Sequence, residues 1–454
     1  MTEPTAGAAS SVPSAGTSPI GAPAGPPDGE PAWIAQALRP PPPEDHVQAA
    51  FSGRRGALFK LLVKNMVLTL LTLGVYRFWA KTWVRRYFWS NTRLLNAPLE
   101  YTGTPVELLL GFLIVLVIMV PLGLAYAGLE FLAPTLSWPA TVAGYGAYFL
   151  IVFLLVQIGF YRMWRYRLTR TVWRGIRFGL DGSAWAYLGR AALWMLATAG
   201  TLWVAAPWAS MALTRYRMEH SRYGTGRFAF DGNGGGLIKR WLVVLVLAGL
   251  PVVLVLSSGA AGYLSVLDAL KSDDPEGTAR AMGQVMGPAM ASFSLYAFLP
   301  FALVWYRVSE ARYVLNHTTF DGARLSSTLS TGSVLWLLVK VYLLYMVLFT
   351  VVGGLFGVVI TLVVIGLAKS SAATVDAQAQ AALVGNAVGF VVVLVFMAGM
   401  SLIQTGILQF GLVKRLCATL TIDDPAVFDR VTQATGTGPG YGEGLADAFD
   451  IGAV

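Results

Sequence analysis

The chain has 454 residues, of which 56% are hydrophobic and only 13% are charged, and its formal net charge is +9. A soluble globular domain carries about 25% charged residues, so this balance excludes an ordinary soluble protein and favours a protein of the lipid bilayer. Cys417 is the single cysteine, which excludes an intrachain disulfide and a thiolate metal site within one chain. The three histidines are scattered, and no zinc-protease, phosphate-loop or serine-hydrolase motif is present. We therefore expect no enzyme activity, no cofactor and no metal.

Residues 1–48 differ in composition from the rest of the chain. They are rich in Pro, Gly, Ala, Ser and Thr and contain consecutive prolines at 40–43. Such a segment buries too little apolar surface to offset its chain entropy, so we expect a disordered arm. It lacks a charged stretch followed by an apolar one, so we do not expect a signal peptide. At the other end, residues 431–454 are expected to form a flexible tail.

A recurring pattern of a large side chain, a small polar residue and glycine divides residues 49–430. Its five copies end at Gly53, Gly103, Gly182, Gly232 and Gly322. Alternating large side chains before the copies predict short strands, with irregular loops as the alternative, and each glycine is expected to form a turn with positive φ before a helix. The copies delimit short units at 51–101 and 180–230 and long units at 101–180, 230–320 and 320–422.

Each long unit contains two apolar runs around a weakly charged connection. The six runs lie at 106–129, 140–160, 241–256, 289–304, 334–367 and 384–410, and most can cross about 30 Å of hydrocarbon. Nearly all Lys and Arg residues of 49–430 lie on the side of the glycine motifs, and positively charged loops stay in the cytoplasm. We therefore predict six full spans, with every glycine motif and both termini in the cytoplasm.

The short units contain too few residues for two full spans. About 34 residues separate Gly53 from Tyr87, whereas two spans need roughly 40. Helix breakers interrupt both units, at Gly74 and at Pro207. We predict re-entrant or tilted helical hairpins that pack inside the helix bundle, where protein satisfies their non-helical backbone, lined by small residues such as Ala205, Ala206 and Ala209.

The predicted fold class is an all-α polytopic membrane protein. It consists of tandem helical-hairpin repeats, with six full spans, two short re-entrant or tilted hairpins, and short cytoplasmic β-strands between the repeats.

Several stretches resemble the YjgN family of bacterial inner-membrane proteins, which carry domain of unknown function 898. The resemblance is carried by Phe51-Ser52-Gly53, by 65–71, by Thr72-Leu73-Gly74-Val75-Tyr76-Arg77-Phe78-Trp79, by Arg86-Tyr87-Phe88-Trp89-Ser90-Asn91-Thr92 and by Leu99-Glu100-Tyr101-Thr102-Gly103. It extends over about residues 47–430. The resemblance implies a multi-pass inner-membrane protein, and it brings no established activity and no catalytic residues.

Basic and aromatic clusters at the helix ends are the candidate binding residues. A tyrosine precedes four of the glycine motifs by fourteen residues, and arginines flank it. The candidates are Arg86, Tyr87, Arg165, Tyr166, Arg167, Arg215, Tyr216, Arg217, Tyr306 and Arg307. Arginine makes bidentate contacts with phosphate, and tyrosine favours headgroup depth, so anionic lipid headgroups are the expected partners. The alternative is the ordinary aromatic belt and topology charge of cytoplasmic helix ends. No nucleic-acid-binding motif accompanies the charges, so nucleic acid is not expected.

Two functions from different classes fit these patterns. The first is a transporter or channel for a small solute or ion, with a cytoplasm-facing site, because broken segments at corresponding positions of repeats are typical of transporters. The second is a non-transporting protein that binds lipid headgroups or scaffolds partners through its cytoplasmic strand motifs. The sequence slightly favours the first.

Overall fold

The computed structural model describes residues 46–271, 275–369 and 375–434. The chain divides into residues 1–44 and a unit from Asp45 to Val454, and the description below concerns that second unit alone. The expectations for the arm up to residue 45 and for the tail from residue 435 lie outside the described residues. Residues 46–48, assigned to the arm from composition, form a strand.

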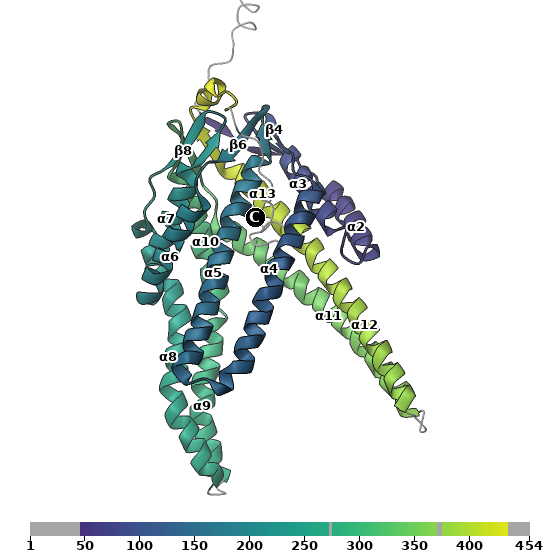
Figure 1. The fold of residues 1–454 in the computed structure, drawn as a ribbon. Coiled ribbons are helices and arrows are strands. Elements are labelled where there is room, and N and C mark those ends of the chain that lie inside the picture. Colours follow the sequence, from purple (N-terminus) through teal and green to yellow (C-terminus); the bar gives the residue numbers. More distant parts are fainter. Residues whose placement is uncertain (1–45, 272–274, 370–374, 435–454) are drawn as a thin grey trace, which may run out of the picture. The chain divides into compact units, whose positions relative to one another are not determined.

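Eleven short strands form one sheet at one end of the helices (Figure 1). They are β1 (His46–Gln48), β2 (Ala50–Phe51), β3 (Thr92–Leu94), β4 (Ala97–Tyr101), β5 (Thr171–Trp173), β6 (Ile176–Leu180), β7 (Ser221–Tyr223), β8 (Gly226–Phe230), β9 (Thr318–Phe320), β10 (Ala323–Ser327) and β11 (Leu420–Asp423). Their order is β1-β11-β10-β9-β8-β7-β6-β5-β4-β3-β2, and every pair is antiparallel. The all-α fold class is therefore wrong, because the repeats share a continuous β-sheet.

The two ends of this strand order are adjacent in the chain. β1 pairs with β11 and β2 pairs with β3, while Ala49 alone separates β1 from β2. The Ala49 amide still donates to Leu420 O at 3.0 Å, and the Ser52 amide donates to Asn91 O at 2.9 Å. One extended segment thus joins the last strand to the first hairpin, and the sheet is nearly closed like a barrel. Closure removes exposed strand edges, which otherwise favour aggregation.

Four of the strand pairs are hairpins with two-residue turns. Their turns are Leu95-Asn96, Arg174-Gly175, Gly224-Thr225 and Asp321-Gly322, and each contains at least one residue with positive φ. Turns of this kind match the twist of antiparallel strands. Gly322 therefore lies between β9 and β10 with φ of +95°, and not before a helix. The strand that leads into the next helix is β10, which follows Gly322.

Aromatic side chains fill the space against one face of the sheet. Trp173, Tyr223 and Phe320 are buried there, and Phe428 of the short helix η4 (Pro425–Arg430) packs onto all three. The rings of Phe320 and Phe428 stack at 4.6 Å between centroids. Burial raises the pKa of the Tyr223 phenol to about 12, and the hydroxyl donates to Trp173 O at 3.0 Å. The sheet therefore has a solid hydrophobic core.

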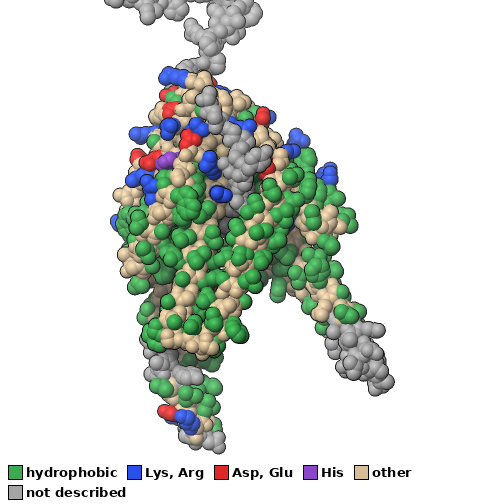
Figure 2. Space-filling model, in the orientation of Figure 1, with side chains coloured by type: hydrophobic (Ala, Val, Ile, Leu, Met, Phe, Trp, Pro, Cys, Tyr) green, Lys and Arg blue, Asp and Glu red, His purple; other side chains and the backbone are tan. Residues whose placement is uncertain are grey.

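The long helices leave this sheet in pairs (Figure 1). They are α4 (Pro105–Leu132) with α5 (Trp138–Thr169), α8 (Ile238–Lys271) with α9 (Pro275–Tyr296) and α10 (Leu299–Asn316), and α11 (Thr331–Lys369) with α12 (Val375–Ile403), the π-helical turn η3 (Gln404–Gln409) and α13 (Phe410–Thr419). Six helical segments among the described residues are long and apolar enough to cross a membrane, as the sequence predicted. Hydrophobic side chains cover them, and charged ones gather over the sheet (Figure 2).

The two short units form compact helical hairpins. The first consists of α2 (Arg55–Leu71) and α3 (Arg77–Asn91), and the second of α6 (Ala184–Gly200) and α7 (Ala206–Glu219). Large apolar side chains at their tips are exposed, with Leu73 at 83% and Leu202 at 77%. The tips therefore differ from the expectation of packing inside the bundle, and Ala205, Ala206 and Ala209 are only half-buried.

Candidate functional site

The strand-to-helix junctions bring the glycine motifs and the basic clusters together. At the junction of β4 and α4, the Tyr101 ring folds back over Gly103, and a Cβ at Gly103 would lie 2.4 Å from the Tyr101 hydroxyl oxygen. Phe230 covers Gly232 in the same way, and a Cβ at Gly232 would lie 2.3 Å from Phe230 Cζ. Gly103 and Gly232 do not have positive φ. The motif needs glycine there because the neighbouring ring occupies the space of a side chain.

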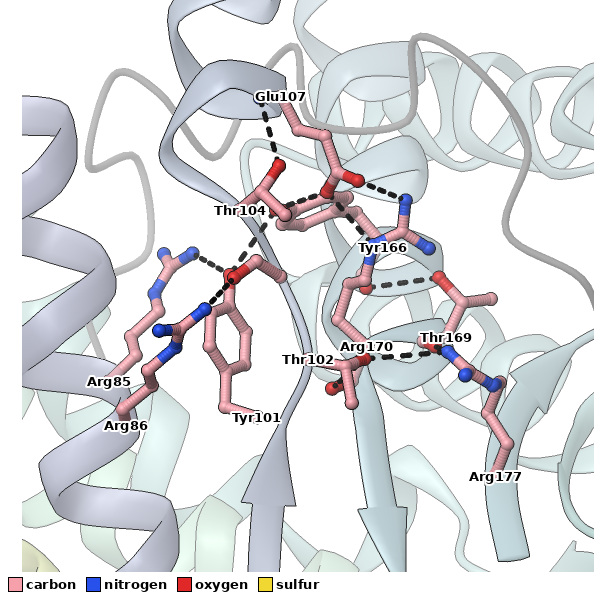
Figure 3. Close-up of polar contacts among 11 residues, drawn as sticks. Arg85, Arg86, Tyr101, Thr102, Thr104, Glu107, Tyr166, Thr169, Arg170 and Arg177 are labelled. Carbon is pink, nitrogen blue, oxygen red and sulfur yellow. Dashed lines mark hydrogen bonds and ion pairs between the residues drawn. The ribbon is translucent and has the colours of Figure 1, made fainter.

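A chain of polar contacts surrounds the β4–α4 junction (Figure 3). Arg85 Nη1 of α3 donates to the Tyr101 hydroxyl at 3.1 Å, and that hydroxyl donates to Tyr166 Oη at 3.3 Å. Tyr166, on α5, donates in turn to Glu107 Oε2 at 3.1 Å. Arg85, Tyr101 and Tyr166 are buried, and the network joins three helices and a strand.

The network ends in an ion pair between Glu107 and Arg170. Arg170 Nε and Nη2 donate to the two Glu107 carboxylate oxygens at 2.9 and 3.0 Å. The Arg170 side chain is 6% exposed and that of Glu107 is 35% exposed. Glu107 lies in the first turn of α4, where the helix dipole favours a negative charge, and its amide donates to Thr104 Oγ1 at 3.4 Å. Arg170 is buried and Glu107 is partly exposed, so solvent screens the pair in part, and the two hydrogen bonds hold α4 to the end of α5.

Four tyrosines hold the junctions from the preceding or following helices. Tyr87 donates to Arg54 O at 2.7 Å, Tyr216 donates to Ser183 O at 2.9 Å, and Tyr166 makes the contacts described above. The fourth is Tyr313, whose hydroxyl accepts from the Asn233 amide at 3.0 Å.

Tyr306, which the fourteen-residue spacing placed in this set, lies elsewhere. It is buried among apolar side chains with its ring 4.9 Å from that of Trp241. His317 follows Tyr313 by four residues, and the centres of their rings are 3.9 Å apart. His220 follows Tyr216 by the same spacing, with ring centres 4.1 Å apart. This repeated Tyr–His spacing is the sequence signal that could have found Tyr313.

Two candidate arginines bond to the motif glycines themselves. Arg86 Nη2 donates to Gly103 O at 3.3 Å, and Arg215 Nη2 donates to Gly232 O at 2.9 Å. The same offset of 129 residues separates Arg86 from Arg215 and Gly103 from Gly232. The two junctions therefore have the same geometry, as an internal duplication requires.

The remaining candidates occupy different environments. Arg165 and Arg167 are half-buried on α5, whereas the Arg307 side chain is 73% exposed and pairs with Glu310 at 2.8 Å. Arg217 lies 4.9 Å from the centre of the Trp164 ring, and its Nη2 contacts Thr214 Oγ1 at 3.0 Å. Burial lowers the pKa of the Arg217 guanidinium, and nearby Tyr187 and Glu310 partly oppose this. These residues do not converge on one pocket.

The sequence did not assign roles to Tyr101, Arg170 or Arg177. Arg177 Nη1 donates to Thr169 O at 2.9 Å and joins β6 to the end of α5. Within 46–271, 275–369 and 375–434, no group of three His, Cys, Asp or Glu side chains could hold a metal ion.

The nearly closed sheet, with six helical segments long and apolar enough to cross a membrane, defines a multi-pass membrane protein. A family described as bacterial protein of unknown function (DUF898) matches residues 46–448, and the chain belongs to that family. The chain is similar to the inner membrane protein YjgN of Salmonella typhimurium, with 32% identity over 142 residues. That match covers 30% of this chain and 33% of the relative. No solved structure matches the chain.

Proposed function

We propose that the protein is a non-enzymatic membrane protein that binds the headgroups of anionic lipids where its helices meet the membrane surface. The observation that carries the proposal is a set of exposed cations on five helices, at the helix ends nearest the sheet. This basic collar consists of Arg162, Arg215, Lys239, Arg307 and Lys340.

The collar residues on three long helices lie at similar distances along their helices from the sheet. Arg162 and Arg307 lie about two turns before the ends of α5 and α10, and Lys340 lies about two turns after the start of α11. At 1.5 Å per residue this is roughly 10–14 Å from the sheet. Lys340 lies 5.3 Å from the Trp336 ring, a cation and an aromatic side chain at one depth. Such pairs suit the interface between headgroups and hydrocarbon.

The Lys and Arg residues at the sheet end of the protein support an orientation with the sheet in the cytoplasm. Figure 2 shows Lys and Arg over the sheet end, and positively charged regions near spans remain cytoplasmic. Both termini then lie in the cytoplasm, because β1 and β11 belong to that sheet. In intact cells, Asp231→Cys should resist an impermeant thiol reagent, whereas Ser137→Cys between α4 and α5 should react. Labelling of Asp231→Cys from outside would refute the orientation.

Transport is the second candidate, and the duplicated, interrupted short hairpins favour it. Two observations support lipid binding over transport. In the most apolar stretch of each candidate span, at most 11% of the residues are buried within the protein. A hollow of about 790 Å³ beside the second hairpin is lined by apolar side chains such as Leu202, Trp241 and Leu303. A solute path needs polar walls, whereas these surfaces suit acyl chains.

Retention of lipid by the purified protein tests the proposal. Arg162, Lys239 and Lys340 are replaced together by alanine, leaving Arg307 in place because it pairs with buried Glu310. Each cation near a membrane surface contributes about 1 kcal/mol, so affinity for phosphatidylglycerol should fall about 100-fold. Phosphatidylcholine binding should not change.

The matched control removes three exposed cations from the sheet, Arg93, Arg227 and Arg324. It should retain phosphatidylglycerol at nearly the original level. If both variants lose the same affinity for phosphatidylglycerol, binding depends only on the net charge of the protein, and the collar site is refuted. Solute or ion flux through vesicles containing the original protein would favour transport instead.

A further inference from the structure

The two short hairpins close with the same backbone turn. Leu202 and Trp203 have positive φ in the second, as Leu73 and Gly74 have in the first. Thr72 and Thr201, 129 residues apart, begin the two turns. Both copies of the hairpin therefore close in one conformation, with positive φ at two consecutive residues.

Each turn satisfies its own backbone donors. All six amide N–H groups from 72 to 77 donate within the hairpin, as do all six from 201 to 206. In each copy, one of the six amides donates to the threonine hydroxyl and not to a backbone carbonyl. The Tyr76 amide donates to Thr72 Oγ1 at 2.9 Å, and the Ala205 amide donates to Thr201 Oγ1 at 3.1 Å. Pro207, which follows the second turn, has no N–H to satisfy. Hydrocarbon excludes backbone with unpaired donors, and these turns have none among those six positions.

The side chains of the tips are large, apolar and exposed. They are Leu71, Leu73 and Val75 in the first hairpin and Leu202, Trp203 and Val204 in the second. Exposed apolar groups of this density on a protein surface mark an interaction with another apolar phase. The adjoining Tyr76 and Arg77 have apolar stems and polar ends, as side chains at a membrane interface do.

Neighbouring spans give the depth of the tips. Trp241 Nε1, in the first turn of α8, donates to Trp203 O at 2.7 Å. At the first hairpin, the Arg77 guanidinium lies 5.9 Å from the ring of Phe112, two turns into α4. Both tips therefore meet a span close to its sheet end. Helices of 17 residues are also only about 25 Å long, short of the roughly 30 Å of a bilayer core.

We propose that both hairpin tips are immersed in the hydrocarbon of the leaflet nearest the sheet and end there. The partner is the acyl chains of that leaflet, and the threonine-closed turn is what allows the non-helical backbone to enter them. This inference holds whether or not the basic collar selects anionic lipids, and it does not depend on which side of the membrane the sheet faces.

Depth-dependent quenching tests the position of the tips. Leu73→Cys and Leu202→Cys, each in a Cys417→Ala background, carry an environment-sensitive fluorophore in vesicles. Lipids with a spin label near the headgroup should quench both sites at least about twofold more than lipids labelled near the chain end. Val117→Cys in the middle of α4 should show the reverse, and Arg324→Cys on the sheet should show little quenching by either. Unquenched tips, or tips quenched most by the deep label, would overturn the proposal.

Removing the hydroxyl tests the role of the turn. Thr72→Val and Thr201→Val remove the acceptor of one amide, so shallow quenching at the tips should fall by about half. Thr72→Ser should restore it. Thr69→Val is the matched control, because its hydroxyl donates to Asn65 O and belongs to the helix before the turn. Melting of each variant in detergent separates loss of insertion from unfolding. Undiminished quenching in a folded Thr72→Val, Thr201→Val protein would refute the role of threonine.

Discussion

The two short hairpins have the same turn, but their bases pack against different parts of the protein. The first packs at its base against the last repeat, where Leu58, Leu62 and Phe88 contact Phe410 of α13. Phe51, in the strand segment that nearly closes the sheet, contacts the same phenylalanine at 5.3 Å. The first hairpin thus stands at the joint between the two ends of the membrane domain.

The second hairpin stands between two long hairpins and uses polar aromatic contacts. Tyr187 and Tyr216 pack there with Tyr161 of α5. Arg217 occupies the position of Phe88, 129 residues later, and its buried Nε has no hydrogen-bond partner among the described residues. The comparison shows that local hydrogen bonds preserve a turn after duplication, whereas the packing at the base follows the neighbours that each copy meets.

The largest expected difference concerns this equivalent pair. Phe88→Ala should destabilise the protein by about 3–5 kcal/mol, because it leaves a cavity beside Phe410. Arg217→Met should leave stability unchanged or raise it by about 1–2 kcal/mol, because an apolar side chain of similar length replaces a partly buried charge whose Nε has no hydrogen-bond partner among the described residues. Thermal or denaturant unfolding in one detergent measures both. A loss above about 1 kcal/mol for Arg217→Met would show that the guanidinium makes net favourable contacts and would contradict the prediction.

A second prediction concerns how the second hairpin meets the segment before α8. A Cβ at Gly234 would lie 2.5 Å from the backbone nitrogen of Trp208 in α7, so Gly234→Ala forces two backbones apart. Overpacking of this kind costs about 2–3 kcal/mol. Gly235→Ala is the control, because its Cβ would meet nothing within 4 Å. Equal melting temperatures for the two variants would mean that α7 does not rest on this segment. The first hairpin, with Pro105 at the equivalent position, should remain intact in both.

The sequence predicted the elements whose signal is long and local. Six apolar runs of membrane length gave the six spans, because hydrocarbon thickness sets a minimum length that composition alone reveals. The two short units, at 51–101 and 180–230, have equal length, and the matching turns at Thr72 and Thr201 support a duplication. The second strands of three hairpins, β4, β6 and β8, were visible because large side chains alternate along them, whereas β10 was not predicted.

The sequence did not reveal features that depend on short or distant partners. The first strands, such as Thr92–Leu94, have three residues each and follow a helix directly, so no alternation can be read. β1 pairs with β11 across most of the chain, and nothing local to His46–Gln48 predicts that. The glycine motif at Gly322 was assigned to the wrong end of a hairpin, although Asp-Gly between apolar residues is a strong hairpin signal. The same shift, from the end of β9 at Phe320 to the end of β10 at Ser327, replaced Tyr313 with Tyr306 in the set of equivalent tyrosines.

The smallest expected effect separates the two tips themselves. Trp241 bonds to the carbonyl of Trp203, while Phe112 stands at the equivalent position beside the first hairpin and has no donor. Trp241→Phe therefore makes the second tip resemble the first, and it should cost about 1 kcal/mol because the Trp203 carbonyl still accepts from the Ala206 amide. Hydrogen exchange of the amides from 201 to 206 should quicken about fivefold, since a free-energy difference of 1.4 kcal/mol corresponds to about tenfold. The amides from 72 to 77 serve as the internal reference. If exchange at the second tip does not change, the indole bond does not hold it, and apolar contact with α8 and lipid is sufficient for both hairpins.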